Sequence, residues 1–203
     1  AAFIGGAIAC LLVFGLSWKS GLNPLKLILV GIAINAMFAG LIEALISFGV
    51  SNSGATTSSL SLKTWDDVTI IVTYGTIGLV LAFALFAWCN VLVLSDKTAK
   101  SIGFNVTTAR IVIAAVAVLL SSVSVVVAGV ILFVGILVPH IARRIVGHDH
   151  KYLIPFTALL GAFIILLADT LGRTLIAPLE IPASTLMAVI GGPFLIFLLR
   201  KEK

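Results

Sequence analysis

The stretch I-V-I-A-A-V-A-V-L-L-S-S-V-S-V-V-V-A-G-V-I-L-F-V-G-I-L-V, residues 111–138, runs for 28 positions without a charged side chain. A helix of about 20 apolar residues can cross a hydrocarbon core roughly 30 Å thick. The composition agrees, because 61% of the 203 residues are hydrophobic, 10% are charged and the mean hydropathy is +1.25. Soluble domains carry about 25% charged residues. The sequence therefore predicts an all-α membrane protein, a polytopic bundle of transmembrane helices.

The charges around this stretch decide how it crosses the membrane. It fits either one tilted helix or two helices joined by a turn near Gly129. Arg110 precedes it, and Arg143 and Arg144 follow it. Basic side chains collect on the cytoplasmic side, and a single crossing would place one of these groups outside. We therefore predict a hairpin at Gly129 whose second arm is short and interrupted.

The same criteria predict seven spans in a single transmembrane domain over residues 1–203. The predicted spans are residues 1–16, 27–49, 70–94, 111–128, 130–142, 153–171 and 183–199. In this topology 11 of the 13 Lys and Arg residues share one side, and only Lys63 and Arg173 lie opposite. The bias predicts a multi-pass protein of the cell membrane with a cytoplasmic C-terminus. Because Ala1 begins inside an apolar run, we expect an N-terminally truncated chain.

The loop over residues 95–110 is too long and too patterned for a simple connector. Ala99 and Ile102 fall three apart on one helical face, and Gly103 can end a helical turn in the left-handed conformation. The residues that can begin the next helix are Asn105 and Thr107. Two short helices with a sharp bend between them would form a projection to which another protein could bind. An amphipathic loop resting on the lipid headgroups is the alternative.

A second patterned stretch, residues 133–150, contains Pro139 inside a predicted span. Proline lacks a backbone donor and kinks or ends a helix, so nearby carbonyls need partners in the bundle or in a water-lined path. This predicts a structural or gating role for Pro139 and the adjacent His140. His140 and the run His148-Asp149-His150 invite a metal interpretation, but the run lies beside three cations. We interpret it as a solvated polar loop, and we predict no metal site and no cofactor.

Two further compositional features carry little functional information. Cys10 and Cys89 both lie inside apolar runs, where we expect packing residues rather than a disulfide or metal ligands. The net charge of +5 does not indicate a nucleic-acid partner, because basic loops are ordinary in membrane proteins.

Acidic side chains within predicted spans are costly unless they have partners, and Glu43 and Asp169 are of this kind. Arg173 follows Asp169 by four positions on the same helical face, so an ion pair is available. The pair can simply orient the helix end, or Arg173 can present a cation to an acidic partner, and the spacing favours neither. Glu180 lies between two prolines in a short, stiff outer loop. The sequence assigns Glu43 no role.

Taken together, these segments resemble the FecCD-type permeases, the membrane subunits of ATP-binding-cassette (ABC) importers for iron(III) siderophores, haem and vitamin B12. The matching stretches are A-x-x-x-G at 99–103, A-G-x-x-x-F-V-G-x-x-V-P-H-I-A-R at 128–143, G-x-D-H at 147–150, L-L-A-D-x-x-x-R at 166–173 and P-L-E-I-P at 178–182. They occur in the family's order and cover nearly the whole chain. Two departures stand out: residues 55–61 lack the family's usual Trp and Gly, and Leu132 replaces a usual Gly.

The resemblance implies about ten spans per subunit and two permease subunits per transporter, so this chain would correspond to spans four to ten. It implies that the residues of the bend belong to coupling helices that contact a cytoplasmic ABC ATPase; these residues are Ala99, Lys100, Ile102 and Gly103. Arg173 would meet a glutamate of an extracellular or periplasmic substrate-binding protein, and Glu180 would share that outer surface. Pro139, His140 and Asp169 would be structural or gating residues.

The implied function is a permease subunit that translocates an iron(III) siderophore, haem or cobalamin. No G-x-x-x-x-G-K-[ST] phosphate loop occurs in the sequence. We therefore expect ATP hydrolysis on a partner chain and no enzymatic activity in this one. One rival is a secondary transporter driven by an ion gradient, with Glu43 or Asp169 as the coupling acid. A weaker rival is an intramembrane enzyme built on His140 and Glu43. The sequence identifies neither the cargo nor whether the permease dimer is a homodimer or a heterodimer.

Overall fold

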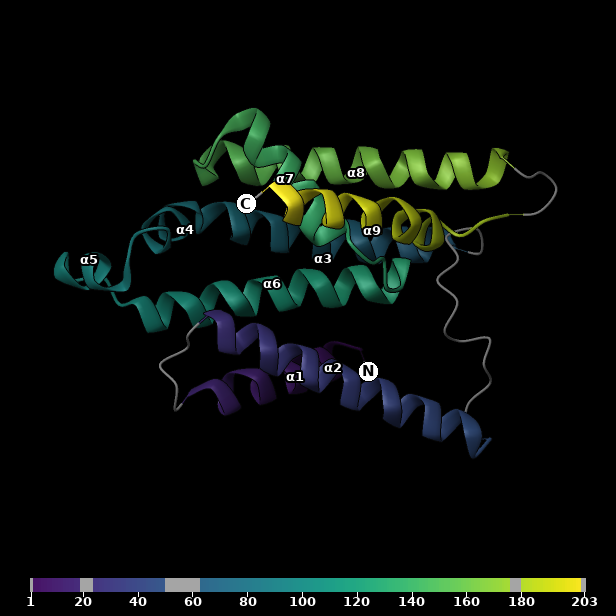
Figure 1. Cartoon of the computed structure of the whole chain (residues 1–203), viewed down its shortest axis with the longest axis horizontal. Helices are drawn as coiled ribbons and strands as arrows, with labels where there is room; N and C mark the ends of the chain where they lie inside the picture. Colours follow the sequence, from purple (N-terminus) through teal and green to yellow (C-terminus); the bar gives the residue numbers. More distant parts are fainter. Residues whose placement is uncertain (1, 19–23, 50–62, 176–179, 202–203) are drawn as a thin grey trace.

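The computed structural model describes residues 2–18, 24–49, 63–175 and 180–201, and these residues form helices and no strands. The helices are α1 (Ala2–Trp18), α2 (Pro24–Ser47), α3 (Trp65–Ala84), α4 (Phe86–Leu92), α5 (Asp96–Ser101), α6 (Val106–Ala128), α7 (Val134–Val146), α8 (His150–Thr174) and α9 (Ala183–Lys201). The long helices lie side by side along the long axis, and the short α5 stands at one end (Figure 1). The predicted all-α bundle is confirmed.

Two helices organise the packing. α6 contacts α1, α3, α4 and α5, whereas α8 contacts α3, α4, α7 and α9. α3 and α4 therefore link one group of helices around α6 to a second group around α8. α2 packs against α1 at the margin of the bundle.

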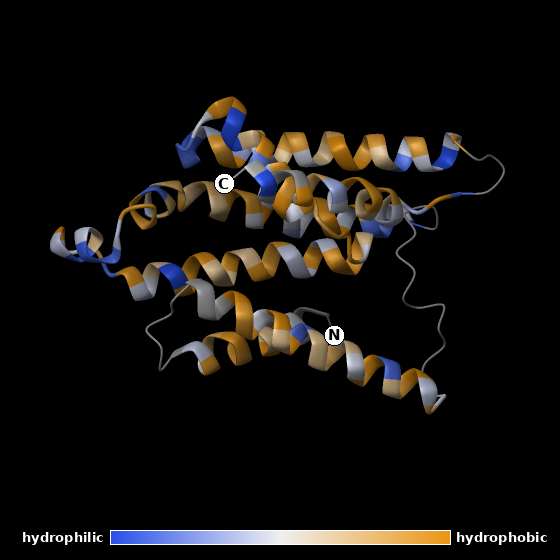
Figure 2. Cartoon of the chain, viewed as in Figure 1, coloured by the Kyte–Doolittle hydropathy of each residue, from blue (hydrophilic) through white to orange (hydrophobic). Residues whose placement is uncertain are grey.

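Four of the described helices are long and apolar enough to cross a membrane: residues 28–47 of α2, and all of α3, α6 and α8. Residues 4–17 of α1 and 183–194 of α9 form shorter apolar helices. Hydrophobic residues predominate along the long helices (Figure 2). Many large apolar side chains are exposed, and Leu11, Phe48 and Leu159 are 73%, 81% and 72% exposed. Water-soluble proteins do not expose apolar surface on this scale, so lipid or partner helices must cover it.

The third predicted span is divided. Residues 70–94 fall on α3 and α4, and the helix breaks at Leu85, whose φ and ψ are −91° and 6°. The Leu85 N–H still donates to the Leu81 carbonyl at 3.2 Å, and the Cys89 N–H donates to the Leu85 carbonyl at 3.0 Å. Backbone hydrogen bonds of the helical type therefore continue on both sides of Leu85, where the helix changes direction. The local sequence has no glycine or proline to announce the break.

The chain reverses direction at Gly129, as predicted. α6 ends at Ala128, and Gly129 has a φ of 73° that favours glycine. The chain then turns back, and α7 begins after Phe133, a non-glycine residue with a φ of 67°. α7 has 13 residues, so it is about 20 Å long and shorter than the hydrocarbon core. It continues through Pro139 to Val146, so of the two predicted effects of Pro139, a kink or an end of the helix, the second is wrong.

Close helix contacts occur where glycine removes a side chain. A Cβ at Gly191 in α9 would collide with Phe133, and a Cβ at Gly172 in α8 would collide with the Ile181 carbonyl. The Ile181 N–H also donates to the Gly172 carbonyl at 3.0 Å. These contacts hold the α6–α7 connection and the segment before α9 against the second helix group.

Candidate docking sites at the two ends of the bundle

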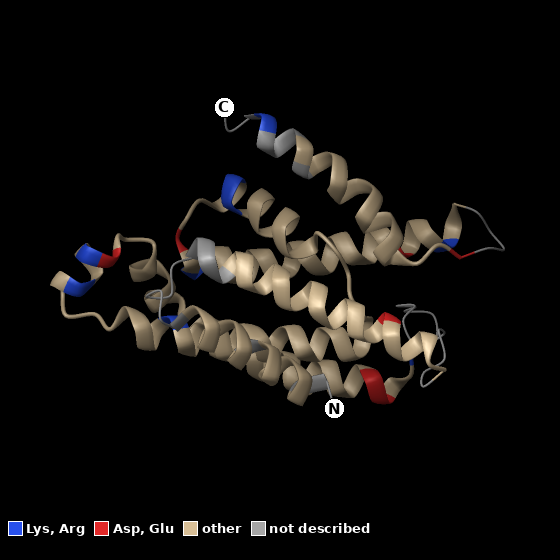
Figure 3. Cartoon of the chain, turned by 60° about the horizontal axis from the view of Figure 1, so that its bottom comes forward, with Lys and Arg blue, Asp and Glu red and all other residues tan. Residues whose placement is uncertain are grey.

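Charged residues separate along the bundle. Most Lys and Arg residues lie at the end that carries α5, and acidic residues lie mainly at the opposite end, although Asp96 is part of α5 (Figure 3). This distribution agrees with the predicted grouping of basic residues, except that Lys19 and Lys203 fall outside the described residues. The two predicted sites, the bend after α5 and the Arg173 region, therefore belong to opposite ends of the molecule.

The bend after α5 is a defined helix ending. Ser95 caps α5 by accepting from the Thr98 N–H at 3.2 Å. After α5, the Gly103 N–H donates to the Lys100 carbonyl at 3.0 Å and the Phe104 N–H donates to the Ala99 carbonyl at 3.1 Å. This pair of bonds is the Schellman motif, and it requires the left-handed conformation that Gly103 adopts, with a φ of 76°. The predicted role of Gly103 as a helix stop is confirmed.

The helix after the bend differs from the prediction. The Asn105 side chain accepts from the Thr108 N–H at 3.2 Å and caps a helix, as one of the two predicted alternatives required. That helix is not a second short one, however, but α6 itself, which runs on for 23 residues. The apolar sequence after residue 111 allows helical bonding to continue without a break. The bend is therefore continuous with a helix that is long and apolar enough to cross the membrane.

An ion pair fixes α5 to the first turns of α6. The Arg110 guanidinium contacts both carboxylate oxygens of Asp96, at 2.8 Å and 3.3 Å. A two-point contact of this kind is stronger and more directional than a single charged hydrogen bond. The Trp88 and Phe104 rings meet edge to face at 6.0 Å and connect the bend to α4. Sequence reasoning missed both contacts, because neither has a helical spacing.

The four predicted coupling residues do not share one face. Ala99 is 1% exposed, whereas Ile102 is 63% exposed, and Lys100 and Gly103 are also exposed. The prediction that Ala99 and Ile102 lie on the same face is wrong, because the helix ends between them. Ala99 packs within the contact of α5 with α6 and α4, and the other three residues form the outer surface of the bend. We call this outer surface, Lys100, Ile102 and Gly103, the coupling surface.

At the opposite end, Asp169 and Arg173 form the predicted ion pair. Arg173 Nε lies 2.9 Å from Asp169 Oδ2, and the two side chains are 42% and 24% exposed. Glu180 is exposed, and its neighbour Ile181 is hydrogen-bonded to Gly172, so the segment carrying Glu180 lies against the end of α8. The structure thus brings the two predicted docking residues to the same end of the bundle. The intrahelical pair exists, and Arg173 remains accessible.

Of the predicted structural or gating residues, Asp169 lies on α8 in the ion pair described above, whereas His140 lies where α7 meets α9. The His140 ring approaches the Phe194 ring edge to face at 6.1 Å, and His140 Nε2 is buried without a hydrogen-bond partner among the described residues. Glu43 lies on α2, which packs against α1, whereas α7 packs against α8 and α9. This arrangement gives no support to a His140–Glu43 catalytic pair. The described residues contain no group of three or more His, Cys, Asp and Glu side chains suited to a metal.

The run His148-Asp149-His150 is polar and largely solvated, as predicted, with His148 and Asp149 exposed, but it is also ordered by hydrogen bonds to α4. Asn90 in α4 donates to Asp149 Oδ1 at 2.8 Å and accepts from the His150 backbone N–H at 2.9 Å. The His150 ring nitrogen Nδ1 lies 2.7 Å from the same Asn90 oxygen. Asp149 also caps α8 by accepting from the Lys151 N–H at 3.0 Å. These hydrogen bonds, first that from Asn90 and then that from Lys151, hold the pKa of Asp149 below its usual value.

Comparisons with known proteins agree with this arrangement. The sequence profile of the FecCD transport family matches residues 1–201. The chain is 39% identical over 197 residues to proteins named as the haem-iron transport system permease IsdF in Staphylococcus aureus strains bovine RF122 and Newman. These matches cover 97% of this chain and 60% of each relative, so the chain spans less than two thirds of their length. A solved structure described as an inward-facing metal-chelate type ABC transporter superposes with a TM-score of 0.83 at 30% identity, over 95% of this chain and 63% of that one.

Proposed function

This chain belongs to the FecCD transport family, and on that basis we propose that it forms part of the membrane-spanning permease subunit of a binding-protein-dependent ABC importer. The observation that carries the proposal is the coupling surface at the end of the bundle rich in Lys and Arg. A capped helix, a Schellman bend and a two-point ion pair support it. These local hydrogen bonds and the ion pair make the segment rigid, whereas a connecting loop without them would be flexible.

The proposed cargo is an iron chelate of the haem or siderophore class. The relatives named as haem-iron permeases and the solved structure described as a metal-chelate transporter support this class. Residues 55–61, where the sequence departs from the family's usual pattern, lie outside the described residues, so the structure does not narrow the class further.

The proposed mechanism begins at α5. An ABC ATPase on another chain binds the coupling surface, and the ATPase displaces this surface as it binds and hydrolyses ATP. Because Asp96 is bound to Arg110, the movement passes to α6 rather than being lost in a flexible loop. α6 contacts α1, α3 and α4, so the displacement spreads through the first helix group. This provides a physical route to alternating access, in which packed helices move as rigid bodies.

The opposite end is proposed to receive the substrate-binding protein. Arg173 donates through Nε to Asp169, and this bond holds the guanidinium in one orientation. Its remaining N–H groups suit a carboxylate on the binding protein. Such a contact would orient the partner over the bundle and speed its association. Glu180 lies at the same end and would select a complementary cation.

The test is a comparison of uptake with ATP hydrolysis in proteoliposomes that contain the complete transporter. Gly103→Val places a β-branched residue at a φ of 76° and should disrupt the bend. We expect hydrolysis to persist while uptake per ATP falls several-fold. Gly49→Val is the matched control, because Gly49 has a φ of 70° and open space around it but lies after α2, away from α5. Equal uptake per ATP in both variants and the unchanged protein would contradict the proposal.

A secondary transporter driven by an ion gradient is a second functional class, and the same proteoliposomes distinguish it from an ABC importer. Transport that continues without the ATPase partner and stops when the ion gradient is collapsed would identify such a carrier. In that case replacement of Asp169, not of Gly103, should abolish uptake. Membership of the FecCD family favours the ATP-driven importer.

A further inference from the structure

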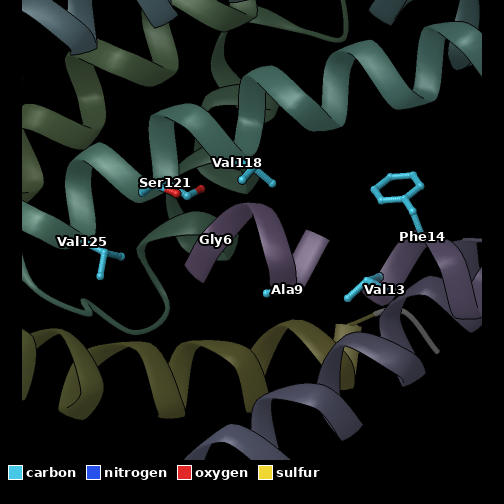
Figure 4. Close-up of a pocket in the computed structure, with 8 residues that line it drawn as sticks. Gly6, Ala9, Val13, Phe14, Val118, Ser121 and Val125 are labelled. Carbon is cyan, nitrogen blue, oxygen red and sulfur yellow. The ribbon is translucent and has the colours of Figure 1, made fainter. Parts of the chain in front are cut away.

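Two of the cavities among the described residues are large and lie outside the sites above. The larger, of about 420 Å³, lies between α1 and α6 and is lined by small and apolar side chains such as Ala9 and Val118 (Figure 4). Its only polar side chains are Ser121 and Ser122, so it presents no charge to select a ligand. The second cavity, of about 360 Å³, does have a charged side chain in its lining. The side chains that line it are Cys89, Leu92, Val93, Ile113, Arg143, His148 and His150.

This second cavity, which we call the basic cavity, combines two kinds of wall. Arg143 comes from the last turn of α7, and His148 and His150 come from the α7–α8 connection and the start of α8. Leu92 and Ile113, from α4 and α6, supply apolar surface on other sides. A ligand that matches the whole cavity must therefore carry both an anion and a hydrocarbon portion.

The charge of Arg143 in the basic cavity is not neutralised within the described part of the chain. Arg143 is exposed and forms no ion pair there. The nearest carboxylate in sequence, Asp149, does not line the cavity, and its oxygens accept hydrogen bonds from Asn90 and the Lys151 N–H. Because Asn90 occupies His150 Nδ1, the orientation of that ring is fixed. Within the described residues the Arg143 charge therefore has no counter-ion, and His150 supplies an oriented hydrogen-bonding group to the same cavity.

The position of the basic cavity selects among anions. His150 begins a helix long enough to span the membrane, and Arg143 ends α7 at the same end of the bundle. The cavity therefore sits at the boundary between hydrocarbon and water, where phospholipid headgroups lie. A free phosphate would satisfy Arg143 but leave the apolar wall unmatched. Basic pockets between transmembrane helices near the headgroup level are suited to anionic lipids.

We propose that the basic cavity binds an anionic phospholipid. The lipid phosphate would contact Arg143, His148 and His150. The part of the acyl chains next to the headgroup would pack against Leu92, Val93 and Ile113. An arginine guanidinium donates two parallel hydrogen bonds to a phosphate. The lipid would join α4, α6 and the α7–α8 connection at one point. This inference does not depend on the transported cargo or on an ATPase partner, so it stands or falls separately from the proposed function.

The test uses the full chain purified in a mild detergent and titrated with phosphatidylglycerol, with bound lipid counted by native mass spectrometry. Arg143→Gln should weaken phosphatidylglycerol binding about fivefold, the effect expected for one basic side chain at a membrane surface. Arg144→Gln is the matched control, because Arg144 is the next residue, is also exposed and does not line the cavity. It should bind as the unchanged chain does. Arg143→Lys keeps the charge and should recover part of the affinity.

Two competitors separate the possible ligands. Phosphatidylcholine has the same chains without a net charge and should not displace phosphatidylglycerol. Inorganic phosphate has the charge without the chains and should not displace it at equal concentration. Displacement by either compound, or an equal loss of binding in Arg143→Gln and Arg144→Gln, would overturn the proposal. Circular dichroism of each variant establishes that helix content is unchanged, and His148→Gln replaces Arg143→Gln if the latter does not fold.

Discussion

Asn90 shows how one amide can set the position of a helix. It donates to Asp149, accepts from the His150 backbone N–H and lies beside His150 Nδ1. The residues that precede α8 are thereby tied to α4, which is distant in sequence. A polar side chain at the end of a predicted span looks unremarkable in the sequence, and only the fold reveals its partners.

We expect Asn90→Leu, a change of similar shape, to lower the free energy of unfolding by about 1–2 kcal/mol, because it removes the hydrogen bonds that Asn90 makes with Asp149 and His150. Thermal unfolding in detergent measures the change. Thr170→Val is the control, since the Thr170 hydroxyl bonds only to the Leu166 carbonyl of its own helix. A loss in Thr170→Val as large as that in Asn90→Leu would show that any lost hydroxyl or amide has this effect.

The lowered pKa of Asp149 predicts a pH dependence for this contact. A carboxyl group whose pKa is lower in the folded state stabilises the fold above its unfolded pKa, and the contribution disappears as the pH falls through the folded value. The ordinary value is 3.8. The stability difference between the unchanged protein and Asn90→Leu should therefore be constant at neutral pH and shrink below about pH 4. A difference that already shrinks between pH 7 and pH 5 would assign the effect to a histidine instead.

Arg173 and Asp169 allow docking to be separated from a purely structural ion pair. Arg173→Glu should weaken binding of the substrate-binding protein on the order of tenfold, because it places a second carboxylate beside Asp169. Asp169→Asn removes the same intrahelical pair but keeps the cation, so it should bind at least as tightly as the unchanged subunit. Surface plasmon resonance with the reconstituted subunit measures both. Equal weakening in the two variants would assign the pair to structure alone.

At the scale of whole elements, the contact of α9 with the α6–α7 connection depends on one of two adjacent glycines. Gly191 faces Phe133, whereas a Cβ at Gly192 would meet nothing within 4 Å. Gly191→Ala should cost about 1–3 kcal/mol through overpacking against a residue whose backbone is held in the left-handed region. Gly192→Ala should be neutral or slightly stabilising, because alanine favours helix. Thermal unfolding of the two variants checks the prediction, and equal midpoints would contradict it.

The elements also show which features a sequence reveals. The hairpin at Gly129 was predictable, because the flanking arginines restrict the topology and glycine accepts the turn. The bend at Gly103 was predictable for similar reasons. The break at Leu85 and the Asp96–Arg110 pair were not. The first lies in a uniformly apolar segment, and the second joins residues 14 positions apart whose meeting depends on the bend between them.

For the molecule as a whole, the separation of charge predicts one orientation in the membrane. In a background without Cys10 and Cys89, Lys63→Cys should react with a membrane-impermeant maleimide in intact cells. Lys100→Cys should react only after the membrane is opened. Both positions are exposed in the structure, so accessibility to the reagent depends on the side of the membrane. Labelling of Lys100→Cys alone in intact cells would reverse the orientation.

The general architecture followed from composition and charge, because an apolar helix must cross the bilayer and the basic side chains determine its direction. The contacts between helices did not follow. They depend on the absence of a side chain at Gly172 or Gly191 and on the neighbour that fills the space. A sequence lists the small residues but does not say which helix lies opposite each one.

The scarcity of buried side chains has a thermodynamic consequence. Among the described residues the largest side chains that are almost fully buried are Met187, Val138 and Ser17, and most large apolar side chains face outward. The heat capacity change of a soluble protein arises because unfolding exposes apolar surface to water. Here separated helices would exchange neighbouring helices for lipid chains, with little new hydration. Unfolding within a bilayer should therefore have a small heat capacity change, and the stability should vary with temperature along a nearly straight line.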